Sequence, residues 1–199
     1  MPLDLAKKFF QKFAVRPIEG DGTTELSPVA AVNSPDHRSA AATQKGTKEG
    51  TVGRPIPGTT AKIVDPETHD IVAPGASGEL CTRGYSVMRG YWDDEERTRE
   101  AIDAEGWMHT GDLATMDDEG YVNIVGRIKD MVIRGGENIY PREIEEFLYG
   151  HPKVADVQVV GVPDQRYGEE LCAWVIVKPG QTMHEDEIRA FCSGRIAHY

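Results

Sequence analysis

Residues 126–141 read GRIKDMVIRGGENIYP, and this stretch decides the interpretation of the carboxy-terminal third of the chain. It predicts a basic strand, a glycine turn at Gly135-Gly136, and a helix that Pro141 opens and that ends at Tyr149. Further strands are expected at 154–162 and 171–177, and a last helix at 185–197. The sequence after Arg127 therefore predicts a compact α+β unit of two strands and two helices.

Short strands with tight turns precede this unit. They are expected at 61–65, 78–82, 113–116 and 121–125, with a helix at 94–102, and this pattern is typical of a small barrel or sandwich. Leu5, Phe9 and Phe13 are spaced four apart, which predicts an amphipathic helix at 3–14. We expect this helix to pack onto a core that is missing from this sequence rather than lie on a membrane surface, because it is short and carries few charges. Residues 33–58 are rich in small and polar residues and are interpreted as an exposed connection.

Composition excludes several classes of protein. The 199 residues include 22 Lys and Arg against 33 Asp and Glu, a formal net charge of -11, which argues against nucleic-acid binding. The apolar runs are strand-sized, so no integral membrane segment is expected, and the absence of a signal core predicts a cytoplasmic protein. Cys81, Cys172 and Cys192 match no metal spacing and are interpreted as buried thiols in a reducing compartment.

Two segments place oxygen-bearing side chains directly after glycine. In the stretch from Gly22 to Glu25, Thr24 offers a hydroxyl to a polyphosphate and Glu25 offers a carboxylate to Mg²⁺. A turn followed by a capped strand explains the same residues. Asp112 follows Gly111 at the start of a strand, where its carboxylate is suited to the two hydroxyls of a ribose, although an aspartate after glycine is also a common turn former.

The stretch 126–141 carries cations and flexible backbone. Arg127 and Lys129 are two residues apart, which would place both on one face of an extended chain and suit phosphate or ribose; a surface pair with Asp130 is the alternative. Gly135-Gly136 permits a ligand to approach the backbone closely, or simply forms a tight turn. A general-base role for His109 is disfavoured because no Ser or Cys nucleophile motif accompanies it.

Taken in order, these segments closely resemble the adenylate-forming superfamily, which contains acyl-CoA synthetases, peptide-synthetase adenylation domains and beetle luciferases. The matching motifs are Gly22-Thr23-Thr24-Glu25, Gly78-Glu79-Leu80, Gly84 with Val87-Met88-Arg89-Gly90-Tyr91-Trp92, Gly106-Trp107 leading to Thr110-Gly111-Asp112, and Gly126-Arg127 through Arg134-Gly135-Gly136-Glu137-Asn138-Ile139-Tyr140-Pro141. Residues 50–199 look like medium- or long-chain fatty acyl-CoA synthetases. The first fifty residues look more like the ligase domain of acyl-carrier-protein synthetase and acyltransferase proteins.

The resemblance implies a fold, a reaction and a site. The fold would be a remnant of a distorted β-barrel at 1–127, the end of a large AMP-binding domain, followed by a small α+β domain at 128–199. The reaction would join a fatty acid to ATP as an acyl-adenylate, and then to CoA or an acyl carrier protein as a thioester. The resemblance assigns phosphate contact to Thr24, Mg²⁺ to Glu25, ribose to Asp112, and ribose or phosphate to Arg127. It also makes Lys129 a hinge and lets the region of Gly135-Gly136 border the passage for pantetheine.

The chain also departs from the family pattern. The triphosphate-gripping loop and the acid pocket would precede Met1, and the family's catalytic lysine would follow His198-Tyr199. Asp21 stands where the family usually has an aromatic residue beside adenine. The expectation is a ligase fragment that is inactive alone, unless a separate large-domain chain supplies the missing half. A non-catalytic docking protein and a nonfunctional relic are the alternatives.

Overall fold

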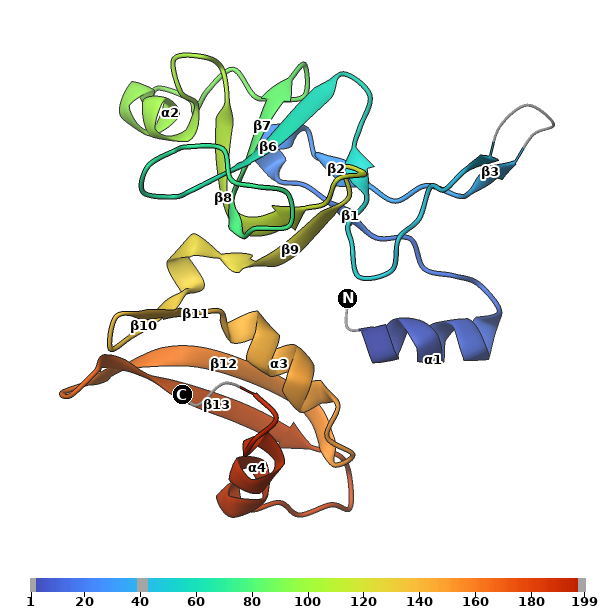
Figure 1. The fold of residues 1–199 in the computed structure, drawn as a ribbon, viewed down its shortest axis with the longest axis vertical. Helices are drawn as coiled ribbons and strands as arrows, with labels where there is room; N and C mark the ends of the chain where they lie inside the picture. Colours follow the sequence, from blue (N-terminus) through green and yellow to red (C-terminus); the bar gives the residue numbers. More distant parts are fainter. Residues whose placement is uncertain (1–2, 39–42, 197–199) are drawn as a thin grey trace. The chain divides into compact units, whose positions relative to one another are not determined.

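The computed structural model describes residues 3–38 and 43–196, and these divide into two compact units. The amino-terminal unit spans Leu3–Ile128, and the carboxy-terminal unit begins at Lys129. Both combine helices with antiparallel sheets, which confirms the α+β class (Figure 1). No helix in the described part of the chain is long and apolar enough to cross a membrane.

The amino-terminal unit is built around an open four-stranded antiparallel sheet. Its elements are α1 (Leu3–Phe13), β1 (Gly20–Asp21), the 3-10 turn η1 (Thr24–Leu26), β2 (Ala31–Val32), β3 (His37–Arg38), β4 (Thr43–Gln44), β5 (Arg54–Pro55), β6 (Thr59–Val64), β7 (Gly78–Gly84), α2 (Glu95–Ala101), β8 (Met108–Met116) and β9 (Val122–Arg127). The main sheet has the order β6-β7-β8-β9, and a small sheet has the order β1-β2-β5. The described strands form no closed barrel.

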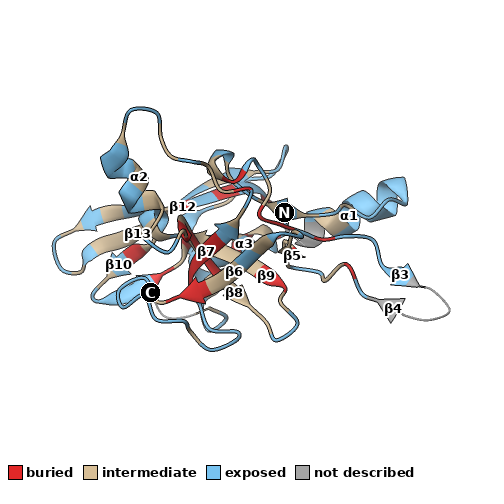
Figure 2. Cartoon of the chain, turned by 90° about the horizontal axis from the view of Figure 1, so that it is seen from above, coloured by how far each residue is buried: buried red, intermediate tan, exposed pale blue. Residues whose placement is uncertain are grey.

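Strand β7 is central to this sheet and buried along most of its length. Residues 78–82 are all buried (Figure 2), and β7 has a neighbouring strand on each side, β6 and β8. Ile63, Leu80, Ala114 and Val122 form the main apolar cluster. A second cluster joins Leu26, next to Glu25, to Met108 at the start of β8. The turn that carries Glu25 and the strand that carries Asp112 therefore share one core.

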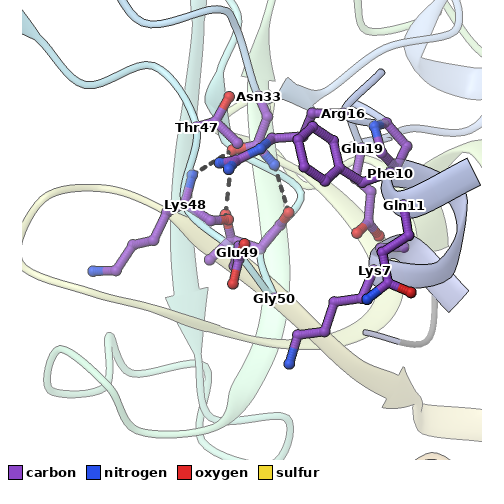
Figure 3. A pocket seen from close by; sticks show the side chains of 13 residues that line it. Lys7, Phe10, Gln11, Arg16, Glu19, Asn33, Thr47, Lys48, Glu49 and Gly50 are labelled. Carbon is purple, nitrogen blue, oxygen red and sulfur yellow. Dashed lines mark hydrogen bonds between the residues drawn. The ribbon is translucent and has the colours of Figure 1, made fainter. Parts of the chain in front are cut away.

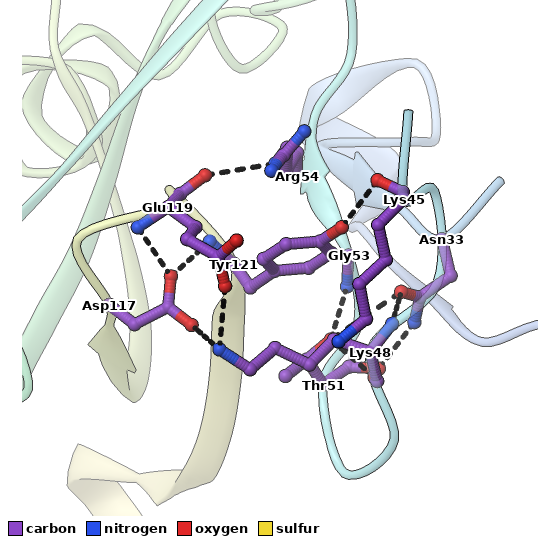
Figure 4. A network of polar contacts seen from close by, with 9 residues as sticks. All are labelled: Asn33, Lys45, Lys48, Thr51, Gly53, Arg54, Asp117, Glu119 and Tyr121. Atoms are coloured by element: carbon purple, nitrogen blue, oxygen red, sulfur yellow. Dashed lines mark hydrogen bonds and ion pairs between the residues drawn. The ribbon is translucent and has the colours of Figure 1, made fainter. Parts of the chain in front are cut away.

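The expectation of an exposed connection at 33–58 is corrected, because several of its residues form ion pairs and hydrogen bonds with the β8–β9 turn. Lys48 forms ion pairs with Asp117 and Glu119, and Tyr121 donates its hydroxyl hydrogen to the Lys45 carbonyl at 2.7 Å (Figure 4). Arg54 donates to the Glu119 carbonyl at 2.9 Å. Small and polar composition thus indicated a loop correctly but did not reveal its partners, which lie about seventy residues further along the chain.

The expected amphipathic helix is present as α1, and its apolar side chains are largely exposed. Leu5, Phe9, Phe10 and Phe13 retain 41–54% of their accessible surface. The Phe9 and Phe13 rings lie 4.7 Å apart, one helical turn along the same face. The pattern predicted the helix, and its packing onto a core outside this sequence stays a prediction.

The carboxy-terminal unit packs helices on one sheet. Its elements are the 3-10 turn η2 (Ile128–Asp130), β10 (Val132–Arg134), β11 (Glu137–Ile139), α3 (Pro141–Tyr149), β12 (Val154–Asp164), β13 (Gly168–Val177) and α4 (Glu185–Cys192), with sheet order β11-β10-β13-β12. The count of two strands for this unit is wrong: β10 lies within the basic strand predicted before Gly135-Gly136, and β11 is three residues long and too short to show a period. The last helix ends at Cys192, and the predicted end at Ala197 lies outside the described residues.

Helix α3 shows why this unit forms. Pro141 occupies the first turn, where its missing N–H costs nothing, and Ile144 and Leu148 are spaced four apart and buried. They pack on Val157 and Val159 of β12. Burial of this apolar stripe is the main stabilising contribution to the unit.

Candidate functional site

Asp112 and Arg127 lie opposite each other on β8 and β9. They are direct register partners, and Arg127 Nε donates to Asp112 Oδ1 at 3.2 Å. The Asp112 side chain is only 8% exposed, whereas that of Arg127 is 55% exposed. The structure therefore combines two residues that the sequence predicted separately, and the guanidinium compensates a nearly buried carboxylate.

The backbone before Asp112 is held by hydrogen bonds from side chains. Gly111 has a left-handed φ of 71°, and its N–H donates to Glu79 Oε1 at 3.1 Å. Thr110 Oγ1 donates to the Leu80 carbonyl at 2.7 Å and accepts from the Asp112 N–H at 3.1 Å. Thr110, Gly111 and Asp112 lie within β8, where its register against β7 shifts, so the turn interpretation is wrong, and this strand irregularity orients the carboxylate.

Glu25 is the second carboxylate of the predicted site. It lies in η1, half-buried, and Tyr91 donates its hydroxyl hydrogen to Glu25 Oε1 at 2.9 Å. Hydrogen bonds from its own backbone amide and from Tyr91 hold the pKa of Glu25 below its ordinary value. The group is therefore ionised at neutral pH, as a ligand for a hard cation must be. The Thr24 side chain beside it is exposed.

Tyr91 is a residue of this site that sequence reasoning missed. It lies sixty-six positions from Glu25, so no local spacing links them, and only its place in the motif that ends at Trp92 marked it. The Met88 N–H of the same segment donates to the Glu25 carbonyl at 2.8 Å. The 84–92 segment thus fixes both the backbone and the carboxylate of Glu25.

The local backbone corrects the expectation that Arg127 and Lys129 lie on one face of an extended chain. Residues 128–130 form the 3-10 turn η2, so the chain is not extended where Arg127 and Lys129 were expected to share a face. With three residues per turn, positions two apart point in different directions. Arg127 ends β9 in the amino-terminal unit, and Lys129 begins the other unit with an exposed side chain.

Gly135 and Gly136 form the tight turn that was one of the two interpretations. Their φ values are 60° and 89°, and Arg134 pairs with Glu137 across them, which is a two-residue hairpin with both central residues left-handed. The Gly135 N–H donates to the Tyr167 carbonyl at 2.9 Å. Turn geometry alone accounts for both glycines.

Burial raises the thiol pKa of two of the three cysteines, Cys81 and Cys192. Cys81 is fully buried, and burial raises the pKa of its thiol to about 12. Cys172 and Cys192 are half-buried, and burial also raises the pKa of Cys192. The thiols of Cys81 and Cys192, whose pKa values are raised, are protonated at neutral pH, which favours a structural role for these two residues.

A cavity of about 190 Å³ lies beside α1. It is lined by Lys7 and Phe10 of α1, by Arg16, and by residues 47–51 (Figure 3). Acidic and basic side chains both face it, and its described lining includes none of the site residues predicted from the sequence. It therefore lies apart from the pairing of Asp112 with Arg127.

Comparison with known proteins places this geometry in a family. The AMP-binding enzyme family matches residues 1–92, and the AMP-binding enzyme C-terminal domain family matches residues 143–199. The chain is 49% identical over all 199 residues to the mitochondrial medium-chain acyl-CoA ligase ACSF2 of Danio rerio, of which it covers 32%. It spans about a third of the length of the curated relatives it matches.

Solved structures agree. ATP-bound MatB from Rhodopseudomonas palustris superposes with a TM-score of 0.89 at 34% identity, over 98% of this chain and 37% of MatB. The o-succinylbenzoate CoA synthetase MenE from Bacillus subtilis, in complex with its acyl-adenylate intermediate, superposes with a TM-score of 0.83 at 30% identity, over 100% of this chain and 38% of MenE. The chain therefore belongs to the AMP-binding, adenylate-forming enzyme family.

Proposed function

We propose that this chain supplies the nucleotide-binding residues of an ATP-dependent acid–thiol ligase that forms an acyl-adenylate and then a thioester. The observation that carries the proposal is the nearly buried Asp112 carboxylate, which Arg127 and the hydrogen-bonded Thr110-Gly111 segment of β8 hold in one orientation. A carboxylate fixed in this way is suited to accept hydrogen bonds from both hydroxyls of a ribose.

Each remaining residue takes a role that its environment allows. Arg127 is more than half exposed and offers further N–H donors to ribose or phosphate beside Asp112. Thr24 offers an exposed hydroxyl to phosphate. Lys129 would act as the hinge at the start of the carboxy-terminal unit, and the Gly135-Gly136 turn would border the passage for the thiol.

Mg²⁺ fits Glu25. One ionised, half-buried carboxylate oriented by Tyr91 is a typical protein contribution to a Mg²⁺ ion that takes its other ligands from phosphate and water. Bound there, the ion would offset negative charge on the phosphates of ATP. Tyr91 keeps the carboxylate in place by donating to one of its oxygens.

The substrates are part of the proposal. The medium-chain acyl-CoA ligases among the relatives support a fatty acid as the acid and CoA as the thiol, with an acyl carrier protein as the alternative acceptor. The relatives are about three times longer than this chain. We therefore propose that it does not form a thioester alone and works with a large domain, in the same or a separate chain.

Calorimetric titration with AMP and with Mg-ATP tests the nucleotide role. We expect Asp112→Ala to weaken AMP binding at least about tenfold, because each lost hydrogen bond to a charged group is worth roughly 1.5–3 kcal/mol. Arg127→Gln should weaken it less, and the exposed Asp118→Ala is the matched control that should leave it unchanged. Circular dichroism verifies that each variant is folded.

Two outcomes would reject the nucleotide role. One is a folded wild-type chain that binds neither nucleotide, which would favour the docking or relic interpretations. The other is binding that Asp112→Ala leaves intact, which would place the nucleotide elsewhere. Acid-dependent release of pyrophosphate by the chain alone would contradict the proposed need for a large domain.

A further inference from the structure

Three metal-binding side chains from separate segments converge on the amino-terminal unit. His69 comes from the turn after β6, Glu79 from β7 and His109 from β8, and one potential ligand atom of each lies within 4.8 Å of the others. We propose that His69, Glu79 and His109 bind a divalent transition-metal ion such as Zn²⁺. The proposal uses none of the residues proposed to contact nucleotide, although Glu79 also accepts a hydrogen bond from the Gly111 N–H beside Asp112.

The type of ligand supports a borderline-soft metal rather than Mg²⁺. Two imidazoles and one carboxylate form a donor set that zinc commonly takes, whereas Mg²⁺ prefers oxygen ligands and water. Zinc bonds of about 2.0–2.1 Å place tetrahedral ligand atoms roughly 3.3 Å apart. A contraction of about 1.5 Å from the widest separation would therefore close the site, which is within reach of a side-chain rotation.

Glu79 and His109 form the rigid half of the site. His109 Nδ1 lies 2.7 Å from Glu79 Oε2, and the side chains of His109 and Glu79 are only 20% and 8% exposed, respectively. His109 is the register partner of Cys81 on the neighbouring strand, two residues from Glu79. The Gly111 N–H holds the other Glu79 oxygen at 3.1 Å. Strand pairing thus fixes both ligands before any ion binds, which lowers the entropic cost of binding.

His69 forms the adjustable half. It is exposed, and its ring lies edge-on to that of His109 with centroids 5.5 Å apart. Its backbone has a φ of 60°, a left-handed conformation that non-glycine residues seldom adopt and that histidine tolerates better than most. The surrounding turn is held by Asp65, whose carbonyl accepts from the His69 N–H at 2.9 Å. The turn therefore directs a mobile imidazole toward a fixed pair of ligands.

The charges around the cluster favour a cation. The Asp103 carboxylate lies 3.8 Å from His109 Nε2, on the opposite edge of the ring from Glu79, where it cannot bind the same ion but helps to orient the imidazole and adds negative charge. Lys62 opposes binding in part, since it lies over the Trp107 ring at 4.4 Å and acts on Asp103. The fixed charges of Glu79 and Asp103 outnumber that of Lys62, and a bound ion would cross-link the 65–70 turn to β7 and β8.

Calorimetric titration of the full chain with Zn²⁺ tests the site. The visible absorption of bound Co²⁺ reports coordination by imidazole. We expect one ion per chain with a Kd of about 10 µM or tighter. His69→Asn should weaken binding about tenfold or more, and asparagine tolerates the left-handed backbone. Glu79→Gln should weaken it as well. His184→Asn, an exposed histidine of the other unit, is the matched control.

The outcomes separate this site from the proposed Mg²⁺ site. Zinc binding that survives excess Mg²⁺ and disappears with His69→Asn supports the site, because Glu25 is intact in that variant. Affinity that is unchanged in a folded His69→Asn chain would overturn the proposal. So would a wild-type chain that binds no Zn²⁺ at about 100 µM.

Discussion

Gly53 offers a sharp test of how the segment before β6 is attached to the sheet. A Cβ atom at this position would lie 2.0 Å from the Val32 carbonyl carbon and 2.1 Å from the Asn33 nitrogen, and φ is 95°. Gly53→Ala must therefore both strain its own backbone and push against backbone that cannot rotate away. Gly75→Ala is the matched control, because its φ is 82° and nothing lies within 4 Å of its added Cβ.

The magnitude follows from the contacts. The left-handed conformation costs about 1–2 kcal/mol for alanine at either position. Displacement of the Gly53 backbone would also weaken or break two hydrogen bonds of 2.8 Å. One runs from the Val122 N–H to the Gly53 carbonyl, and the other from the Val52 N–H to the Val122 carbonyl. At roughly 0.5–1.5 kcal/mol each, they add about 1–3 kcal/mol. We expect a loss of about 2–5 kcal/mol for Gly53→Ala and about 1–2 kcal/mol for Gly75→Ala.

Urea unfolding measures the difference. Trp107 is buried in the amino-terminal unit, and the exposed Trp92 and Trp174 can be replaced by phenylalanine so that fluorescence reports this unit alone. Equal losses of unfolding free energy in the two alanine variants would refute the reasoning. It would mean that the close approach of Gly53 to Val32 does not contribute to stability.

Three further predictions concern the core and the pH dependence of stability. Tyr121→Phe should lower the unfolding free energy of the amino-terminal unit by about 0.5–1.5 kcal/mol, because the Lys45 carbonyl loses its donor; a larger loss would indicate repacking. Leu148→Ala should cost the carboxy-terminal unit about 2–5 kcal/mol, since the side chain is 1% exposed; a loss below about 1 kcal/mol would contradict its place in the core. Arg134 holds the pKa of Glu170 below its ordinary value of 4.5, so the ionised form stabilises the fold above that pH, and the stabilisation is lost as the pH falls through the folded-state pKa. Glu170→Gln should therefore make the unfolding free energy of the carboxy-terminal unit fall less steeply between about pH 5 and pH 3. The fluorescence of Trp174, the single tryptophan of this unit, follows the unfolding. An unchanged slope would reject the role assigned to the Arg134–Glu170 pair.

Local sequence patterns predicted the elements whose signals are themselves local. Helix α3 has Pro141 in its first turn and two buried apolar residues four apart, so its start and its inward face could be read directly. Strands β12 and β13 are long and rich in apolar residues. This signal also lies within the local sequence, so both strands were predicted. Strand β11 was missed, because three residues carry no measurable period, whereas β10 lies within the basic strand predicted before the glycine turn. The pairing of β10 with β11 and with β13 forms the rest of this part of the sheet.

Motif order by itself determined the family, since a series of short signatures in register is a property of the chain alone, and the family matches confirmed it. Only the tertiary structure decided which residues touch. It paired Asp112 with Arg127, attached Tyr91 to Glu25, and assembled His69 with Glu79 and His109. The first two of these contacts join residues 15 and 66 positions apart, because sheet register and turn geometry bring them together. No spacing along the chain encodes such a contact, whereas antiparallel pairing specifies it residue by residue.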